Sequence, residues 1–398
     1  MSDTQPTPEN YTKGFRLKLE KICSSLEFDN NEQNIHTPWR LCKQMLSKLS
    51  ESCDLTTKTI CVINLELVEV LCYDFKVKPE NIYIITDCQN KANVMKHPRY
   101  KGVNVYVADY LYINLNNNMK FSVVCSNPPY QIESENKAQT KPIWQNFVSK
   151  SLDLLEDGGH LCMVHPNGWR DVNGMFEDTK ELLQSKDIKY LEMHDMNDGV
   201  KTFGVQSNYD WYILKNTSPT GKTHIKGQDG TEYNIDISKM GFIPSRKFDE
   251  IEKLIAKEGE EKVSMISDSA YHTQRDYISK TQDDTYKYPV IYSIKMGDIP
   301  TLRYSSRNDN GHFGIPKFIW GGGVCTSIGS IIDIDGNFGQ TQFARSLIDI
   351  PENLPLIKKA FDSLKFKEIM KACPNQNNNI NHKVIALFRK DWWKEFVE

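Results

Sequence analysis

Short apolar, β-branched runs alternate with segments of helical periodicity over the first half of the chain. Seven runs have the length and composition of strands: 59–64, 82–86, 103–107, 121–125, 160–165, 189–194 and 209–214. Segments with helical spacing lie between several of them: 65–75, 91–98, 142–155 and 176–185. Strands alternating with helices predict a doubly wound, mainly parallel sheet, so the predicted fold class is α/β.

Two helices are predicted before the first strand. Residues Phe15 to Leu26 form one amphipathic stretch. The second helix is expected to use Thr37 as its N-cap and Pro38 as its first residue. Apolar residues then recur at four-residue spacing from Leu41 to Leu49, which predicts one buried helical face.

The pattern of alternating strands and helices ends after residue 216. A turn-rich segment with a hairpin pattern is followed by a short helix, irregular β structure and two helical stretches: 217–234, 248–257, 286–345, 354–370 and 382–396. We therefore expect a boundary near 216–240 and predict three parts: a tail and helix over 1–35, one domain over 36–220 and a second over 221–398.

Composition narrows the class of protein. The 398 residues are 39% hydrophobic and 25% charged, which is typical of a folded chain. No apolar run approaches the about 20 residues that cross a bilayer, and the polar N-terminus has no signal-peptide core, so a cytoplasmic protein without membrane contact is expected. Ten cysteines without a CxxC pair predict buried thiols and no metal site.

Charge gives little support for a nucleic-acid partner. The net charge is −3, with −5 over residues 1–214 and +2 over residues 215–398. Contact with an anionic polymer would have to come from a local surface, and the second half is the better candidate.

The sharpest local signal is the motif Asn127-Pro128-Pro129-Tyr130, which directly follows the apolar run 121–125. This position predicts a rigid rim at the carboxyl edge of the sheet, where open α/β sheets bind ligands. The Asn127 side chain and a backbone carbonyl of the Asn-Pro unit are acceptors that can hold both hydrogens of an exocyclic amine. Tyr130 offers a flat face to the ring. The alternative is a Pro-Pro turn that merely ends a strand.

With these motifs the chain resembles the adenine-N6 DNA methyltransferases of the gamma arrangement, and within them the Eco57I-like methylases of Type II restriction-modification and phage type. The resemblance covers about residues 36–396 and implies a Rossmann-like methyltransferase sheet, followed by an α+β target-recognition domain that binds double-stranded DNA. It implies S-adenosyl-L-methionine as cofactor, a flipped adenine as target and a bacterial, phage or viral source. Association with a restriction or partner subunit is a further expectation, and the oligomeric state stays open.

The resemblance also implies roles for single residues. Thr37 matches the Thr-Pro element beside the methionine end of the cofactor. Asp87 matches the acid that holds the ribose hydroxyls, as expected for a carboxylate at this strand end, and Cys88 follows it in the same site. Asp109 matches the acid that contacts the cofactor's adenine amino group.

The first cofactor motif departs from the family because it carries no glycine. Its turn is expected to pass the cofactor with Asn64, Leu65 and Glu66. Asn64 and Glu66 are therefore expected cofactor ligands, and Glu66 would bind the methionine ammonium. The alternative is an amphipathic helix with Glu66 and Glu69 in solvent.

Two further assignments concern the target base and the DNA. Phe203 is the candidate aromatic that packs against the flipped base, with Tyr209 or Trp211 as its competitors. In the second half, basic and aromatic residues alternate in a pattern that suits a groove-facing surface or an ordinary solvated face: Arg303, Tyr304, Arg307, Phe313, Lys317, Trp320 and Arg345.

Two other functions remain open. A catalytically inactive homologue could serve as a DNA-binding or scaffold subunit, since the first motif lacks glycine. A protein methyltransferase acting on glutamine side-chain amides also uses an Asn-Pro-Pro-Tyr loop, although the long C-terminal region argues against it.

Overall fold

The computed structural model describes residues 14–17, 19, 36–115, 119–133, 139–323, 327–374 and 379–397. The chain divides into two compact units, which we describe separately. The first comprises Met1–Trp169 and Gly174–Met240, and the second comprises Arg170–Asn173 and Gly241–Glu398.

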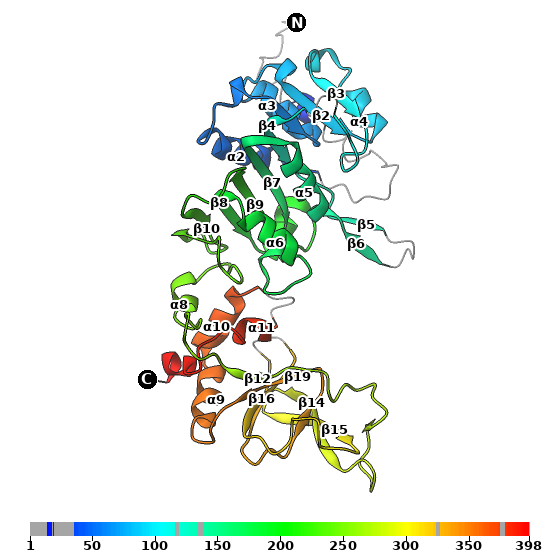
Figure 1. Cartoon of the computed structure of the whole chain (residues 1–398). Coiled ribbons are helices and arrows are strands. Elements are labelled where there is room, and N and C mark those ends of the chain that lie inside the picture. The colour runs from blue at the N-terminus through cyan, green and yellow to red at the C-terminus, as the bar shows by residue number, and fades with distance from the viewer. Residues whose placement is uncertain are drawn as a thin grey trace, which may run out of the picture. The chain divides into compact units, whose positions relative to one another are not determined.

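Nine strands among the described residues form the sheet of the first unit (Figure 1). They are β1 (Ile60–Val62), β2 (Ile82–Thr86), β3 (Asn104–Val107), β4 (Phe121–Ser126), β7 (Leu155–Pro166), β8 (Asp187–His194), β9 (Tyr209–Lys215), β10 (Thr223–Lys226) and β11 (Glu232–Ile235). Their order is β11-β10-β8-β9-β7-β4-β1-β2-β3. Pairing is parallel except around β9 and at β11. The predicted α/β class is confirmed, as are all seven predicted strands.

The chain leaves β1 in one direction, to β2 and β3, and then returns to β4 on the other side of β1. The strand order therefore reverses between β1 and β4. A crevice opens at such a reversal, outside the carboxyl ends of the strands.

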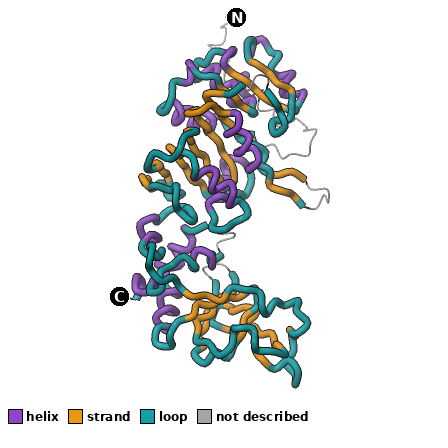
Figure 2. Tube along the Cα trace, viewed as in Figure 1, coloured by secondary structure: helices purple, strands orange, loops and turns teal. Residues whose placement is uncertain are grey.

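Helices cover both faces of this sheet (Figures 1 and 2). They are α2 (Trp39–Ser50), α3 (Leu65–Tyr73), α4 (Gln89–Val94), α5 (Trp144–Leu154), α6 (Glu177–Gln184) and α7 (Met196–Phe203). Ile60 and Val62 join the apolar cluster of α2 and α3, so Cys61 faces the other side. A short hairpin separates β4 from α5: β5 (Gln131–Glu133) and β6 (Thr140–Pro142).

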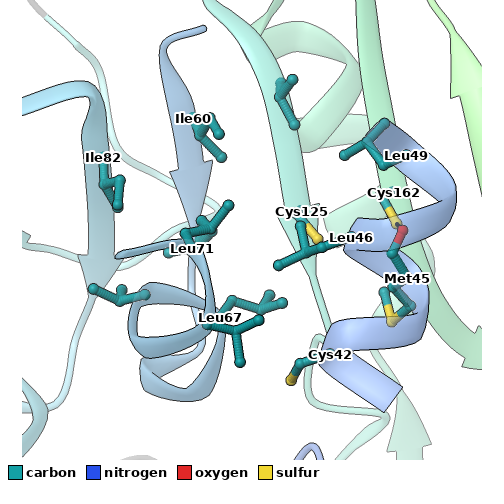
Figure 3. Packing of buried hydrophobic residues seen from close by; sticks show 14 of the residues in the cluster. Cys42, Met45, Leu46, Leu49, Ile60, Leu67, Leu71, Ile82, Cys125 and Cys162 are labelled. Atoms are coloured by element: carbon teal, nitrogen blue, oxygen red, sulfur yellow. Dashed lines mark hydrogen bonds between the residues drawn. The ribbon is translucent and has the colours of Figure 1, made fainter. Parts of the chain in front are cut away.

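The α2 helix buries the face that its apolar spacing predicts. Its buried residues are Leu41, Cys42, Met45, Leu46 and Leu49. Figure 3 shows this face beside Cys125 of β4 and Cys162 of β7. The predicted N-cap is wrong, because the helix begins at Trp39 with Pro38 in the cap position and no side-chain cap bond. Thr37 instead makes hydrogen bonds with Glu66 and Asn127.

The α3 helix is buried on all sides of its first two turns. Glu66 and Glu69 are 5% and 0% exposed. Glu69 accepts from Arg99 Nη2 at 2.7 Å and Nε at 3.0 Å, and from the Tyr100 hydroxyl at 3.1 Å. The alternative of an amphipathic helix with solvated acids is therefore wrong, since these partners compensate the buried carboxylate.

The first unit ends at Met240, the last residue of the range 216–240 predicted for the boundary. β10 pairs in parallel with β8, and β11 pairs with β10, so the turn-rich hairpin extends the sheet. The predicted boundary after residue 220 thus lies inside the first unit, and the division falls between Met240 and Gly241. The hairpin predicted within 217–234 is confirmed, and its polar composition suits strands at the edge of the sheet.

The second unit is α+β, as predicted. Its described residues form two four-stranded sheets, ordered β12-β19-β16-β17 and β13-β15-β14-β18. The strands are β12 (Ser264–Ile266), β13 (Ile278–Ser279), β14 (Tyr288–Lys295), β15 (Ile299–Ser305), β16 (Lys317–Gly321), β17 (Ser330–Asp333), β18 (Gly339–Gln340) and β19 (Ala344–Ile348). The helices are α8 (Phe248–Glu252), α9 (Leu354–Asp362), α10 (Leu364–Ala372) and α11 (His382–Ile385).

The predicted helix over 354–370 is two helices, because Ser363 ends α9 and caps α10 by accepting from the Phe366 N–H at 3.1 Å. Across the described ranges, every helix is too short or too polar to cross a bilayer. The cytoplasmic location stays a prediction.

Candidate functional site

Four polar side chains follow the carboxyl ends of four adjacent strands in the first unit. Asn64 lies after β1, Asp87 after β2, Asp109 after β3 and Asn127 after β4. All four line one pocket of about 480 Å³, its open mouth included. This pocket occupies the edge where the strand order reverses, which is the ligand-binding edge of an open α/β sheet.

A pair of hydrogen bonds joins the turns after β1 and β4. Asn64 Nδ2 donates to the Asn127 backbone carbonyl at 2.9 Å, and the Asn127 backbone N–H donates to Asn64 Oδ1 at 2.7 Å. The two residues are 4% and 2% exposed. This Asn64–Asn127 bridge connects the glycine-free turn directly to the Asn-Pro-Pro-Tyr loop.

The Asn127 side chain is held from the other direction by Thr37. Asn127 Nδ2 donates to Thr37 Oγ1 at 3.0 Å, and the Thr37 backbone N–H donates to Glu66 Oε1 at 3.2 Å. His36 Nε2 lies 3.4 Å from the same carboxylate oxygen. Thr37 and Glu66, both predicted to bind cofactor, therefore form a buried support behind Asn127.

An aromatic series begins at Tyr130, which is 5% exposed. Its ring meets that of Phe203 edge-on at 6.3 Å, and Phe203 meets Tyr209 edge-on at 4.9 Å. Tyr209 stacks on His194 at 4.3 Å. Trp211 is 1% exposed and belongs to the apolar core. Among the three predicted aromatics, Phe203 alone pairs with Tyr130 and stays half-buried.

Burial affects the tyrosines of this series. It raises the pKa of the Tyr130 hydroxyl far above its ordinary value and raises that of Tyr209 to about 12. Both phenols are neutral at physiological pH, so the aromatic series places no phenolate beside a bound ring.

The structure separates the predicted site residues into groups. Those that line the pocket are Asn64, Asp87, Asp109, Asn127 and Pro129. Those outside its lining are Thr37, Glu66, Cys88, Pro128, Tyr130 and Phe203. Cys88 is 3% exposed, and its backbone N–H donates to Thr86 Oγ1 at 3.1 Å. Its thiol is therefore buried beside the site.

The sequence reasoning missed several pocket residues: Ile63, Ile85, Thr86, Lys91, Tyr110 and Phe147. Tyr110 stacks on Phe147 at 5.4 Å with an interplanar angle of 8°, and its hydroxyl lies 2.8 Å from Ser151 Oγ. Tyr110 directly follows Asp109, a signal that could have found it. Phe147 lies on α5, and no local pattern connects it with the pocket.

One of the four basic candidates in the second unit, Lys317, is buried, and Arg345 is half-buried. Lys317 is 0% exposed, pairs with Asp333 Oδ2 at 2.9 Å and donates to the His312 carbonyl at 2.7 Å. Arg345 Nη1 donates to the Ala344 carbonyl at 2.8 Å, and burial lowers the Arg345 pKa. The groove-facing expectation is wrong for Lys317, since β16 and β17 place it directly opposite Asp333.

The other two basic candidates contact an aromatic ring and an acidic side chain, respectively. Arg303 is half-buried and lies over the Tyr292 ring at 4.2 Å. Arg307 is exposed, and its Nε donates to Asp309 Oδ1 at 2.6 Å. Within the described residues, no group of three His, Cys, Asp or Glu side chains could hold a metal ion.

The first unit matches a known family model. Residues 44–203 match the Eco57I restriction-modification methylase. The match runs from within α2 to the end of α7 and includes every predicted site residue except Thr37. The resemblance inferred from the motifs is confirmed over these residues.

A curated relative supports the same class of protein. An uncharacterized adenine-specific methylase of Mycoplasma pneumoniae (strain ATCC 29342 / M129 / Subtype 1) is 26% identical over 237 residues. The match covers 55% of this chain and spans 50% of that relative's length.

Solved structures show weaker likeness. A type I restriction-modification system methyltransferase subunit from Streptococcus thermophilus is 15% identical, with a TM-score of 0.42 over 59% of this chain and 56% of that one. The type IIG restriction endonuclease BpuSI is 10% identical, with a TM-score of 0.49 over 92% of this chain and 61% of that one. These likenesses are too distant to carry an inference about function.

Proposed function

We propose that this chain transfers a methyl group from S-adenosyl-L-methionine to the N6 amine of an adenine flipped out of double-stranded DNA. One observation carries the proposal: Asn127 is held by Asn64 and Thr37 on the rim of a pocket that also presents Asp87 and Asp109. The match of residues 44–203 to the Eco57I restriction-modification methylase supports it.

The pocket residues suit a nucleoside cofactor. Asp87 follows β2, where a carboxylate accepts from ribose hydroxyls. Asp109 would accept from the adenine amino group, and Ile63, Ile85 and Phe147 offer apolar walls for the purine. When bound, S-adenosyl-L-methionine supplies an electrophilic methyl group, to which the target nitrogen bonds as the carbon–sulfur bond breaks.

The Asn127 loop would hold the target amine. The backbone carbonyl of Asn127 already accepts from Asn64, so the Pro128 carbonyl is the backbone acceptor we assign to the amine. The Asn127 side-chain oxygen is the second acceptor. Two acceptors on the amino hydrogens favour a pyramidal nitrogen with its lone pair free to react. The displaced proton leaves to water once the amine is methylated.

The aromatic pair would receive the flipped base. Extrusion costs a few kcal/mol, which stacking offsets. Tyr130 offers its ring to the base face, and Phe203 lies edge-on to Tyr130. The neutral state of Tyr130 keeps an unpaired negative charge away from the base.

We assign DNA recognition to residues 241–398 of the second unit and expect a restriction or partner subunit to act with this chain. The resemblance of the C-terminal region to target-recognition domains supports the first assignment. The exposed Arg307 and the half-buried Arg303 are its basic candidates.

The test is expression in a host without adenine methylation, followed by modified-base sequencing of genomic DNA. We expect N6-methyladenine at one recurrent sequence, and none with Asn127→Ala. Unmodified adenine in the presence of folded wild-type protein contradicts the proposal. Methylated glutamine in host proteins would instead support the protein methyltransferase alternative.

A further inference from the structure

We propose that Asn64 is a positioning residue for methyl transfer, which presets the Asn127 loop before substrate binds. This inference rests on the proposed function and extends it. It assigns Asn64 a role different from that of a cofactor ligand, although the residue also lines the pocket.

The bridge needs the chemistry of an amide side chain. Asn64 donates to the Asn127 carbonyl and accepts from the Asn127 N–H, and a carboxamide presents a donor and an acceptor side by side. A glycine at this position would have neither group. The glycine-free turn after β1 thus supplies a side chain that hydrogen-bonds the backbone after β4.

Both bridged backbone groups lie out of solvent, since Asn127 is 2% exposed. A buried backbone donor or acceptor without a partner is costly. In this structure Asn64, 63 residues away in sequence, supplies the partner for both groups of one residue. The hydrogen bonds of both backbone groups of Asn127 are therefore satisfied only when the loop holds the orientation seen in the structure.

That orientation determines which atoms face the target amine. With its carbonyl engaged by Asn64, Asn127 leaves the next carbonyl, that of Pro128, as the acceptor of the loop. Thr37 fixes the Asn127 amide nitrogen, so the side-chain oxygen is directed away from Thr37. Misplacement of a reacting group by about 1 Å can cost about 100-fold in rate.

The variant Asn64→Asp tests the donor half of the bridge with little change in volume. The introduced carboxylate can accept from the Asn127 N–H but repels the Asn127 carbonyl. Once protonated, it regains a donor and restores both hydrogen bonds. Burial and the facing carbonyl raise the pKa of the introduced group, so protonation falls in an accessible pH range.

We expect Asn64→Asp to lower kcat by about 100-fold at pH 8. The deficit relative to wild type should shrink as the pH falls, by about tenfold per pH unit until the introduced carboxyl is protonated. The Kd for S-adenosyl-L-methionine should change less than kcat. A residue with a merely structural role would give no recovery in acid.

The matched control is Asn104→Asp. Asn104 Nδ2 also donates to two backbone carbonyls, those of Glu80 at 2.9 Å and Ile82 at 3.2 Å. It is the first residue of β3 and therefore lies at the amino end of the strand, opposite the pocket. It does not line the pocket. Its pH profile and kcat should follow wild type.

Wild-type kcat at pH 8 in Asn64→Asp would overturn the inference, as would a deficit that is constant with pH. If this variant does not fold, amide hydrogen exchange in the wild-type protein decides. The Asn127 N–H should exchange slowly, and fast exchange would contradict the bridge. Absence of methyl transfer by wild-type protein would instead count against the proposed function and leaves the exchange measurement valid.

Discussion

The rim of the pocket has two unlike halves. After β1 and β4, Asn64 and Asn127 are almost fully buried and hydrogen-bonded to each other through side chain and backbone. After β2 and β3, Asp87 is half-buried and Asp109 is exposed, and the Asp109 carboxylate accepts a local N–H, that of Leu111, at 2.8 Å.

This difference suits two different tasks. A group that must orient a reacting nitrogen gains from being fixed beforehand, because no reorganisation is then needed at the moment of reaction. A group that must bind and release a cofactor gains from access to solvent. We therefore expect the buried half to determine the rate of methyl transfer and the open half to determine cofactor affinity.

The largest expected effect is at Asn127. Asn127→Ala removes one of the two acceptors for the amine, so kcat should fall by about 100- to 1000-fold, as for loss of a donor to a developing charge. The Kd for S-adenosyl-L-methionine should stay close to that of wild type, as measured by titration calorimetry. Equal losses in rate and in cofactor affinity would contradict the expectation that the buried half of the rim determines the rate alone.

The next effect concerns the ring of Tyr130. Base–aromatic stacking contributes about 1–3 kcal/mol, so Tyr130→Ala should lower kcat/KM for DNA by about 5- to 150-fold. The hydroxyl is buried and has no hydrogen-bond partner among the described residues. Tyr130→Phe should therefore keep nearly full activity. A loss in Tyr130→Phe as large as in Tyr130→Ala would show that the hydroxyl, not the ring, is required.

A smaller effect is expected at Asp87, in the open half. Hydrogen bonds to charged groups contribute about 1.5–3 kcal/mol, so Asp87→Asn should raise the cofactor Kd by about 10- to 150-fold. Saturating cofactor should restore kcat, which steady-state kinetics at two cofactor concentrations can show. A kcat deficit that persists at saturation would place Asp87 in the chemical step.

The smallest effect is expected at Asp109. Its carboxylate is exposed, and exposed charges are screened by solvent and salt. Asp109→Asn keeps a carbonyl acceptor, so the cofactor Kd should rise by about threefold at most. A rise larger than that of Asp87→Asn would reverse the order within the open half.

The sequence predicted the sheet well because its signals are local. Runs such as 82–86 and 121–125 carry the apolar pattern of a buried strand, and the structure has strands at both. The hairpin at 223–235 was predicted, but its addition to the edge of the main sheet was not, because polar residues suit an edge strand and an isolated hairpin equally well. Its pairing with β8 depends on residues about 30 positions earlier in the chain.

The site was predictable only in part, for the same reason. Asp87 and Asn127 follow buried strands directly, and position alone indicates a ligand-binding edge. The Asn64–Asn127 bridge and the Lys317–Asp333 ion pair join residues from different strands, and no local pattern specifies such partners. Thr37 matched a helix cap by sequence, yet tertiary contact with Asn127 determines its role.

The most direct test of this account is titration calorimetry of S-adenosyl-L-methionine into the wild-type protein without DNA. We infer that the glycine-free turn still forms a cofactor pocket. We predict saturable binding at one site per chain, kept in Asn127→Ala and weakened in Asp87→Asn. No saturable binding to the folded wild-type protein would contradict the account and favour a scaffold subunit.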